Sequence, residues 1–436
     1  MKNQINDAKF DYKWVIVAIC FLMIFVTLGF CSSNASLYTF AITETLGISR
    51  SAYSLNGTAR FVSTSLINIF FGTLIAKFGP KKLICAGFIC LIATMIIYSV
   101  ATNVFVFYLG GALLGIGMSW CGTTMVSSII NRWVTENKGT VMGVVLAANG
   151  LGGALAAQIV SPIIYDEQNA FGYRNAYRLV AVILAATLVL VLIFFKDKPK
   201  GSNGNNFVVH KKKSRARDWI GIEYSKAQKL SFFIPTLICI FLTGFVLHGI
   251  GGVASVHQKD VGMSTGYIAT VASVHSIALT LFKFLTGFIY DKKGLRFTMT
   301  VCSVAAIVSM ICLSLQANTL VGKILAMIYG VVSSLSLPLE TIMLPIYAGD
   351  LFGQKSFDKV LGVFVSVNTA GYALGSPAMN LVYDIFGDYK YGLIACAILM
   401  TVVLITMQFI ITAANRMRKK VITEAEQQKI NGEVTV

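Results

Sequence analysis

Long apolar stretches alternate with short polar turns along almost the whole chain of 436 residues. Each stretch has about 20 residues, which is the length that an α-helix needs to cross the hydrocarbon core of a bilayer. The pattern therefore predicts an all-α polytopic membrane protein. Its twelve predicted transmembrane helices are 14–38, 51–77, 83–101, 104–131, 139–164, 173–195, 230–256, 264–290, 297–315, 320–348, 360–383 and 391–413.

Composition agrees with this prediction. Hydrophobic residues make up 56% of the chain and charged residues 13%, with a mean hydropathy of +0.73, whereas a soluble domain is about half apolar and a quarter charged. All nine cysteines lie in apolar stretches without a CxxC pattern, so we expect them to pack, with no disulfide and no metal site. We find no phosphate-binding loop, and we expect no cofactor and no enzymatic activity.

One long polar stretch, 196–229, separates the first six predicted helices from the last six, and its Gly, Asn and Lys content is typical of a linker. We predict an N-terminal six-helix half at 1–195, a basic linker at 196–229, a C-terminal six-helix half at 230–415 and a tail at 416–436. The letters IGIEYSKAQK at the end of the linker indicate a short surface helix.

The net charge of +17 is distributed unevenly along the chain. Most of the Lys and Arg residues fall on the side that holds both termini. This imbalance predicts a plasma-membrane protein with cytoplasmic termini, and it indicates contact with anionic lipid rather than with nucleic acid. Two cations lie inside predicted spans, Arg60 and Lys283, and the opposite side carries only Arg50, Arg174, Arg178, Lys259, Lys323 and Lys390.

Two motifs occur once in each predicted half. The pattern G-x-x-x-[A/D]-K-x-G-x-[K/R] begins at Gly72 and again at Gly287, 215 residues later, and N-x-x-G-x-A-L begins at Asn149 and again at Asn368, 219 residues later. Each helix that carries the second motif then ends on Tyr-Asp, at 165–166 and 383–384. Two parallel six-helix repeats of this kind build some secondary transporters.

The first motif resembles the signature of the major facilitator superfamily. Ala76 stands where the acid of the signature is expected, while Asp291 keeps it in the second half. The resemblance implies that the charged turns brace the cytoplasmic side during gating; the residues concerned are Gly72, Lys77, Gly79, Gly287, Asp291, Gly294 and Arg296. The stretches 131–155 and 344–353 are further similar to the monocarboxylate transporters and the related oxalate:formate antiporters.

Lys283 is the first candidate for a functional residue, because a charge inside the bilayer is costly and normally faces a cavity and a partner. In the monocarboxylate and oxalate transporters an arginine at this spacing before the glycine binds the substrate carboxylate, which implies an anion contact for Lys283. The alternative is a permanent salt bridge to another helix. Asn368 matches a lysine of the oxalate transporters, which favours a monoanion or a substrate with a polar tail, although Asn368 can equally join two helices.

The offset of 215 maps Arg60 onto His275 and Lys283 onto Asn68. Arg60 is a candidate for substrate binding or gating, against pairing with a lipid or a helix-end group. His275 is a weaker substrate candidate, because it is turned about 80° from Lys283 around the helix. Asn34, Tyr38 and His248 complete the candidate polar residues, each with helix contacts as the alternative.

Glu340 is the one acid deep within a predicted span, between Pro338 and Pro345. Burial favours its protonated form and a nearby cation its ionised form, a balance suited to proton coupling. It can also act as the counter-ion of Lys283 or as part of a purely structural pair. The flanking prolines are expected to loosen this helix.

The sequence thus predicts a monomeric secondary carrier of a small organic anion, in the first place a monocarboxylate. Alternating access would be coupled to proton symport or to a counter-transported anion. The alternatives are an exporter of amphipathic or cationic compounds on the same fold and a non-transporting membrane sensor.

Overall fold

The computed structural model describes residues 12–33, 35–48, 50–164, 171–197, 219 and 221–430. Asn34, the Tyr-Asp pair at 165–166 and most of the linker lie outside the described residues. Every regular element in the described part is a helix. They are α1 (Lys13–Cys31), α2 (Ala35–Leu46), α3 (Arg50–Ile69), α4 (Phe71–Phe78), α5 (Pro80–Val100), α6 (Val104–Cys121), α7 (Thr123–Trp133), α8 (Lys138–Ile164), α9 (Gly172–Phe194), α10 (Tyr224–Ala227), α11 (Phe233–Asp260), α12 (Thr265–Lys293), α13 (Leu295–Ser314), α14 (Leu320–Ser336), α15 (Pro338–Thr341), α16 (Met343–Tyr347), the π-helix η1 (Ala348–Phe352), α17 (Phe357–Phe386) and α18 (Lys390–Ile430).

Among the described residues, ten helices are long and apolar enough to span a bilayer. An eleventh span is the bent pair Leu55–Ile69 and Phe71–Phe78, whose two parts meet at 62°. The 30-residue helix α17, which is richer in polar side chains, completes a set consistent with the twelve predicted spans.

Four of the predicted spans are not single helices. The spans 14–38, 51–77 and 104–131 each divide into two helices, and the span 320–348 divides into α14, α15, α16 and η1. Extended backbone at Gly122 (φ −89°, ψ −153°) separates α6 from α7. A proline has no N–H to donate to the preceding turn, which favours a break in the helix before it. In agreement, α15 begins at Pro338, and α16 begins at Met343, two residues before Pro345. The predicted loosening at these two prolines is confirmed.

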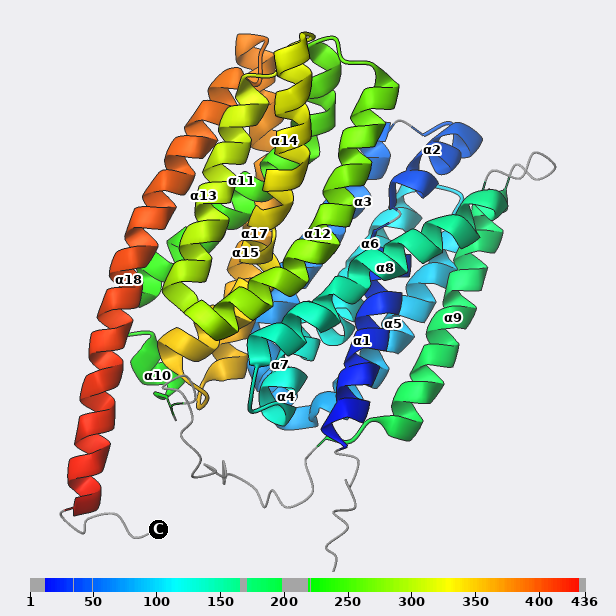
Figure 1. The fold of residues 1–436 in the computed structure, drawn as a ribbon. Coiled ribbons are helices and arrows are strands. Elements are labelled where there is room, and N and C mark those ends of the chain that lie inside the picture. The colour runs from blue at the N-terminus through cyan, green and yellow to red at the C-terminus, as the bar shows by residue number, and fades with distance from the viewer. Residues whose placement is uncertain are drawn as a thin grey trace, which may run out of the picture.

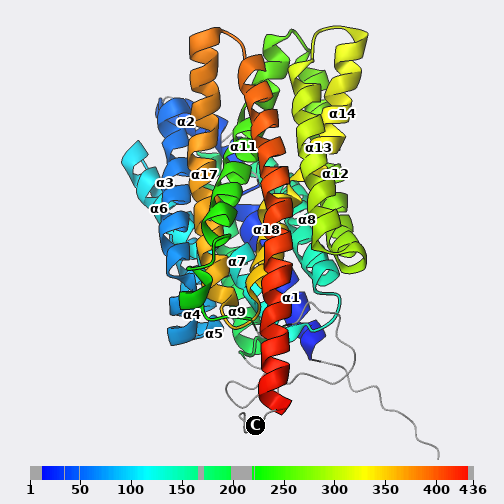
Figure 2. The same ribbon diagram turned by 90° about the vertical axis from the view of Figure 1, so that its left-hand side faces the viewer.

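The helices form two groups that lie side by side (Figure 1). Helices α1 to α9, blue to green, lie on the right of that view, and α11 to α18, green to red, lie on the left. Figure 2 shows that α18 covers the outside of the second group. The start of α1 and the end of α18 lie at the same end of the bundle, here called the terminus end. Two helix pairs join the groups: α12 packs along α8, and α17 packs along α3.

The two joining pairs repeat the same crossing. A Cβ on Gly287 would collide with the backbone of Gly139 on α8, and a Cβ on Gly72 would collide with the backbone of Lys359 on α17. One turn further from the terminus end, Gly143 meets the Lys283 carbonyl, as Gly362 meets the Asn68 carbonyl. Three of these relations have the offsets of 215 and 219 found in the sequence, and the offset between Gly139 and Lys359 differs from 219 by one residue, so the predicted pseudo-symmetry of the halves is confirmed. The exact limits of the predicted domains remain predictions.

Small residues also close each half internally. Gly29 of α1 meets Gly152 of α8, and Gly244 of α11 meets Gly371 of α17, again at the same two offsets. Close backbone approach through small residues is how membrane helices gain packing energy where lipid gives no hydrophobic driving force between them. The turns after α4 and α12 need glycine for another reason. The backbone of Gly79 (φ +78°) and of Gly294 (φ +87°) has a positive φ, which residues with a Cβ rarely adopt.

The end of the linker docks on the second half. Trp219 is buried, and its carbonyl accepts a hydrogen bond from the Gln354 amide, while the Ile222 amide donates to the Phe352 carbonyl. The exposed Lys355 ammonium donates to Glu223 at 2.7 Å, and this contact holds the pKa of the Glu223 carboxyl below its ordinary value. The predicted surface helix is present as the single turn α10.

The glycine crossing of α12 with α8 yields a stability prediction. Gly287→Ala places a methyl group against the Gly139 carbonyl, and such overpacking costs about 1–3 kcal/mol. We expect a lower unfolding temperature of the purified protein in detergent. Gly266→Ala on the same helix is the matched control, because a Cβ there meets no atom within 4 Å and alanine favours helix. Equal unfolding temperatures for the two variants would contradict the crossing.

Candidate functional site

Lys283 is buried at the crossing that joins the two halves. Its side chain is 5% exposed, and its carbonyl packs on Gly143 of α8. Among the described residues it has no hydrogen-bond acceptor and no acidic partner, so the alternative of a permanent salt bridge to another helix is absent from this part of the chain. A lysine at the centre of a bilayer costs about 2.5–3.5 kcal/mol on insertion scales. An anion from outside the chain would offset that cost.

Arg60 on α3 is the second intramembrane cation, and it also lacks a carboxylate. Its Nη1 donates to Ser32 Oγ at 3.0 Å, and its guanidinium carbon lies 4.6 Å from the centroid of the Phe61 ring. A hydroxyl and an aromatic face orient a guanidinium but do not neutralise it. In the described part of the chain, each half therefore contains one intramembrane cation without an acidic partner, of which Lys283 is buried and Arg60 is partly exposed.

Glu340 on α15 lies elsewhere than expected for a counter-ion. Its neighbour is the Tyr372 hydroxyl, and its Oε1 has no hydrogen-bond partner in the structure. No ion pair with Lys283 is present among the described residues, so the counter-ion interpretation does not hold for this conformation. The described contact of the Glu340 carboxyl is with Tyr372 of α17 instead.

An aromatic cluster connects Glu340 to the first half. The His248 ring of α11 stacks on the Tyr372 ring of α17, with centroids 4.7 Å apart and planes at 18°. Phe61 contacts both rings edge-on, at 5.2 Å and 5.8 Å. His248 was only a weak candidate in the sequence, and Phe61 and Tyr372 were missed, because one phenylalanine among 29 and one tyrosine among 17 carry no distinguishing pattern.

Among the described residues, two cavities lie at equivalent positions, one in each half. The first has about 210 Å³ and is lined by Arg60, Tyr38, Tyr53, Asn56, Tyr98 and Tyr177, among others. The second has about 190 Å³ and is lined by residues that include Gln258, His275, Ser276, Ser309, Tyr329 and Ser333. The offset of 215 relates lining pairs of the two cavities, such as Arg60 with His275 and Met95 with Met310. Neither cavity is lined by Lys283 or Glu340.

The other predicted residues fall into two classes. Tyr38 lines the first cavity, where its hydroxyl has no partner and its ring stacks on Tyr177 at 4.2 Å. Asn368 instead contacts a neighbouring helix, and His275 both lines the second cavity and contacts α14. The Asn368 amide nitrogen donates to the Ile240 carbonyl at 3.2 Å, and His275 Nδ1 lies 3.0 Å from Ser333 Oγ. The structure thus brings Arg60 and Tyr38 together, and places Asn368 in a helix contact.

Asp291 caps a helix of the opposite half at the terminus end. Its carboxylate accepts hydrogen bonds from the amides of Gly139 (3.1 Å) and Thr140 (2.6 Å) and from the Thr140 hydroxyl (2.7 Å). These amides begin α8, and a negative charge at a helix N-terminus is favourable. Lys77 and Arg296 of the two turns point elsewhere, toward the Phe78 ring and the Thr412 hydroxyl.

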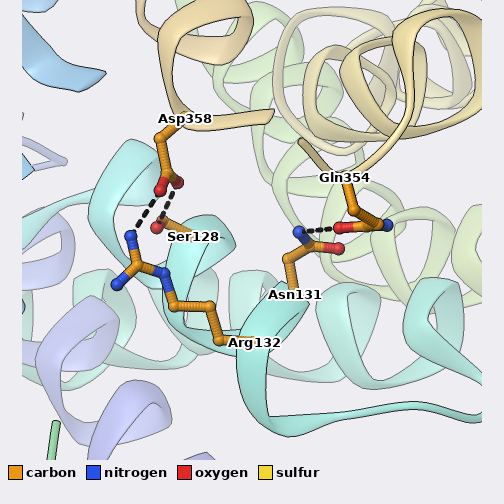
Figure 3. Close-up of polar contacts among 5 residues, drawn as sticks. All are labelled: Ser128, Asn131, Arg132, Gln354 and Asp358. Atoms are coloured by element: carbon orange, nitrogen blue, oxygen red, sulfur yellow. Dashed lines mark hydrogen bonds and ion pairs between the residues drawn. The ribbon is translucent and has the colours of Figure 1, made fainter. Parts of the chain in front are cut away.

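The equivalent crossing uses another acid, because exposed Ala76 has no carboxylate to offer. Asp358 in the first turn of α17 pairs with Arg132 and accepts a hydrogen bond from Ser128, both on α7 (Figure 3). Beside them, Asn131 Nδ2 donates to Gln354 Oε1 at 2.5 Å. We call the Asp291 and Asp358 contacts the terminus-end clasp, since both hold the two halves together at that end.

The clasp predicts a shift of the conformational equilibrium in one variant. Asp291→Asn removes the charge at the α8 N-terminus, which is worth up to about 2 kcal/mol when partly buried, so the terminus end should open roughly tenfold more often. The measurement is the labelling rate of an added Asn131→Cys by an impermeant maleimide, with the protein lacking that cysteine as the blank. Asp384→Asn, an exposed acid near the far end of α17, should leave the rate unchanged. An unchanged rate in Asp291→Asn would show that the cap does not hold the halves.

Sequence and structure comparisons relate this chain to membrane transporters. The sequence profile of the Major Facilitator Superfamily matches residues 19–347 and 236–432. The chain is 23% identical to the sialic acid transporter NanX of Escherichia coli over 80% of its own length and 81% of the relative. It is 20% identical to human monocarboxylate transporter 2, covering 88% and 82% of the two chains. Its fold matches the transporter FucP in the outward conformation with a TM-score of 0.69, at 15% identity over 92% and 99% of the chains. The chain belongs to the Major Facilitator Superfamily of multi-pass membrane transporters.

Proposed function

We propose that this protein is a secondary active carrier of a small organic anion, in the first place a monocarboxylate. The observation that carries the proposal is the pair of intramembrane cations, the partly exposed Arg60 in one half and the buried Lys283 in the other, neither of which has a carboxylate partner among the described residues. A carboxylate substrate would supply the missing charge. Two relatives whose names specify an acid, sialic acid and a monocarboxylate, support the same class.

Substrate charge follows from the number of available cations. Asn368 stands at the position where a second lysine would serve a dianion, and its amide is engaged by the α11 backbone. A monoanion therefore matches Lys283 better than a dianion does. A lysine also offers a point charge rather than a bidentate fork, which suits carboxylates in several orientations.

Transport would proceed by alternating access. The terminus-end clasp holds the halves together at one end, and the substrate would enter from the other. Release requires that α8 move against α12 and α17 against α3, the two pairs that join the halves. The excess of basic residues on the terminus side supports a cytoplasmic location of that end, in the plasma membrane.

Coupling to protons would use Glu340. Its carboxyl contacts the Tyr372 hydroxyl and lacks a cationic partner in the described part of the chain, so it can exchange a proton without breaking an ion pair. Phe61 is the contact through which a change at Glu340, Tyr372 and His248 would reach Arg60. The runner-up mode is exchange of one carboxylate for another without net proton movement.

The rival functions predict a different charge balance. An exporter of cationic compounds needs acids along its path, whereas the described spans place two intramembrane cations, Arg60 and Lys283, against the single deep acid Glu340. Competition between carboxylates and lipophilic cations for uptake would distinguish the two. A non-transporting sensor would give no uptake at all.

The first functional prediction concerns Lys283. Lys283→Gln keeps the length and removes the charge, so uptake of acetate, lactate and pyruvate into proteoliposomes should fall at least roughly 30-fold, because losing one partner of a buried charge pair costs about 2–5 kcal/mol. Lys283→Arg should retain part of the uptake. Lys259→Gln, an exposed lysine, is the control for handling and reconstitution. Unchanged uptake of every carboxylate in Lys283→Gln would refute the site.

The second functional prediction separates coupling from binding. Glu340→Gln cannot release a proton, so a pH gradient should no longer drive uptake, while counterflow between internal and external carboxylate should persist. Glu44→Gln, an exposed acid on α2, should show both activities. Gradient-driven uptake that survives in Glu340→Gln would assign the coupling to another group.

A further inference from the structure

The two equivalent cavities differ in chemistry although they share position and size. The offset of 215 pairs their lining residues, and their volumes are about 210 and 190 Å³. The fold alone therefore accounts for a cavity at this depth in each half. Only the first contains a permanent cation, Arg60, at the position that His275 occupies in the second. The feature to be explained is therefore the set of residues that line the first cavity, and not the presence of a cavity.

The first cavity is large enough for one aromatic ring. A cavity of about 150 Å³ lined by apolar side chains binds benzene, and this one has about 210 Å³. Phe30, Met95 and Leu114 supply apolar wall, and the stacked rings of Tyr38 and Tyr177 stand 4.2 Å apart with planes at 15°. Because the two tyrosine rings stack on each other, a planar guest would lie beside this pair rather than between its rings, in an offset or edge contact.

Two hydrogen-bond donors line the same cavity, the Arg60 guanidinium, which has no carboxylate acceptor among the described residues, and the Tyr38 hydroxyl, which has no acceptor at all there. The described contacts of Arg60 are the Ser32 hydroxyl and the Phe61 ring, and the buried Tyr38 hydroxyl, on a residue that is 3% exposed, has no partner. The neighbouring Tyr98 hydroxyl is already used, since it donates to Asn56 Oδ1 at 2.8 Å. A guanidinium and an unsatisfied hydroxyl beside an aromatic wall are complementary to one carboxylate attached to a ring.

We propose that this cavity is a binding site for a benzoate-sized aromatic monocarboxylate, with its carboxylate on Arg60 and Tyr38 and its ring against the apolar wall of Phe30, Met95 and Leu114. The inference rests on the proposed function and deepens it. Arg60 is equivalent to His275, which lies eight residues before Lys283, so the site is about 12 Å farther from the terminus end than Lys283. The substrate would bind first at Arg60 and then reach Lys283.

The test is thermal unfolding of the purified protein in detergent with added ligand, because a ligand that binds the native state raises its stability. Benzoate should stabilise the wild type at lower concentration than acetate, which lacks the ring, and than benzyl alcohol or benzylamine, which lack the negative charge. Arg60→Gln should raise the half-maximal benzoate concentration at least tenfold, and Tyr38→Phe should raise it a few-fold. Where Arg60→Gln does not fold, Arg60→Lys should give an intermediate loss.

Two variants make the result specific. Tyr329→Phe removes a buried hydroxyl from the equivalent cavity and should leave the benzoate response unchanged. Lys259→Gln, an exposed lysine that lines neither cavity, should also keep it. Equal benzoate responses in the wild type and Arg60→Gln, or equal binding of benzyl alcohol and benzoate, would overturn the inference.

Failure of the inference is distinguishable from failure of the proposed function. If benzoate does not bind while acetate uptake still depends on Lys283, the cavity assignment falls and the carrier function stands. If benzoate binding depends on Arg60 while no carboxylate is transported, the cavity assignment stands and the carrier function falls.

Discussion

The close approach of α8 to α12, and of α3 to α17, is the contact on which the rest of the structure depends. At each crossing two backbones touch through glycine, and no side chain separates them. Such contacts gain dispersion energy only at short range, so even a small separation of the two backbones weakens the crossing. Because the same glycines occur in both halves, one geometry is used twice. Lys283 lies on this crossing, so its charge is held where the two halves meet.

Much of this architecture follows from the sequence, because each feature has a local cause. Apolar length predicts the spans, and the motif glycines at offsets of 215 and 219 predict which helices correspond. The breaks were harder to foresee. Pro338 and Pro345 indicate the breaks beside them in the sequence. Gly122, by contrast, divides a span through one residue with extended backbone. A glycine within an apolar stretch more often indicates close helix packing than a break. Helix boundaries depend on tertiary contacts that a single chain pattern does not contain.

The candidate site was predictable in part. Arg60 and Lys283 stand out because a charge among apolar residues is costly, and this signal survives without any structure. The contacts that these side chains make cannot be predicted from the sequence in the same way. The pairing of Glu340 with Tyr372, the stack of His248 on Tyr372 and the contact of Asn368 with Ile240 all join helices distant in sequence. Tyr53, Tyr98 and Tyr177 carry no intrinsic cost, so nothing in the sequence marked them as neighbours of Arg60.

Because Ala76 stands at the position of an acid, the two sides of the terminus-end clasp use different acids, and these differ in solvent exposure. Asp291 is buried, with 8% of its surface exposed, and it caps a helix through backbone amides. Asp358 and Arg132 keep 22% and 33% of their side chains exposed. Dissolved ions screen exposed charges strongly and buried ones weakly. Ionic strength therefore acts on the α17 side of the clasp more than on the α8 side, and the two joints between the halves respond unequally to the same solution.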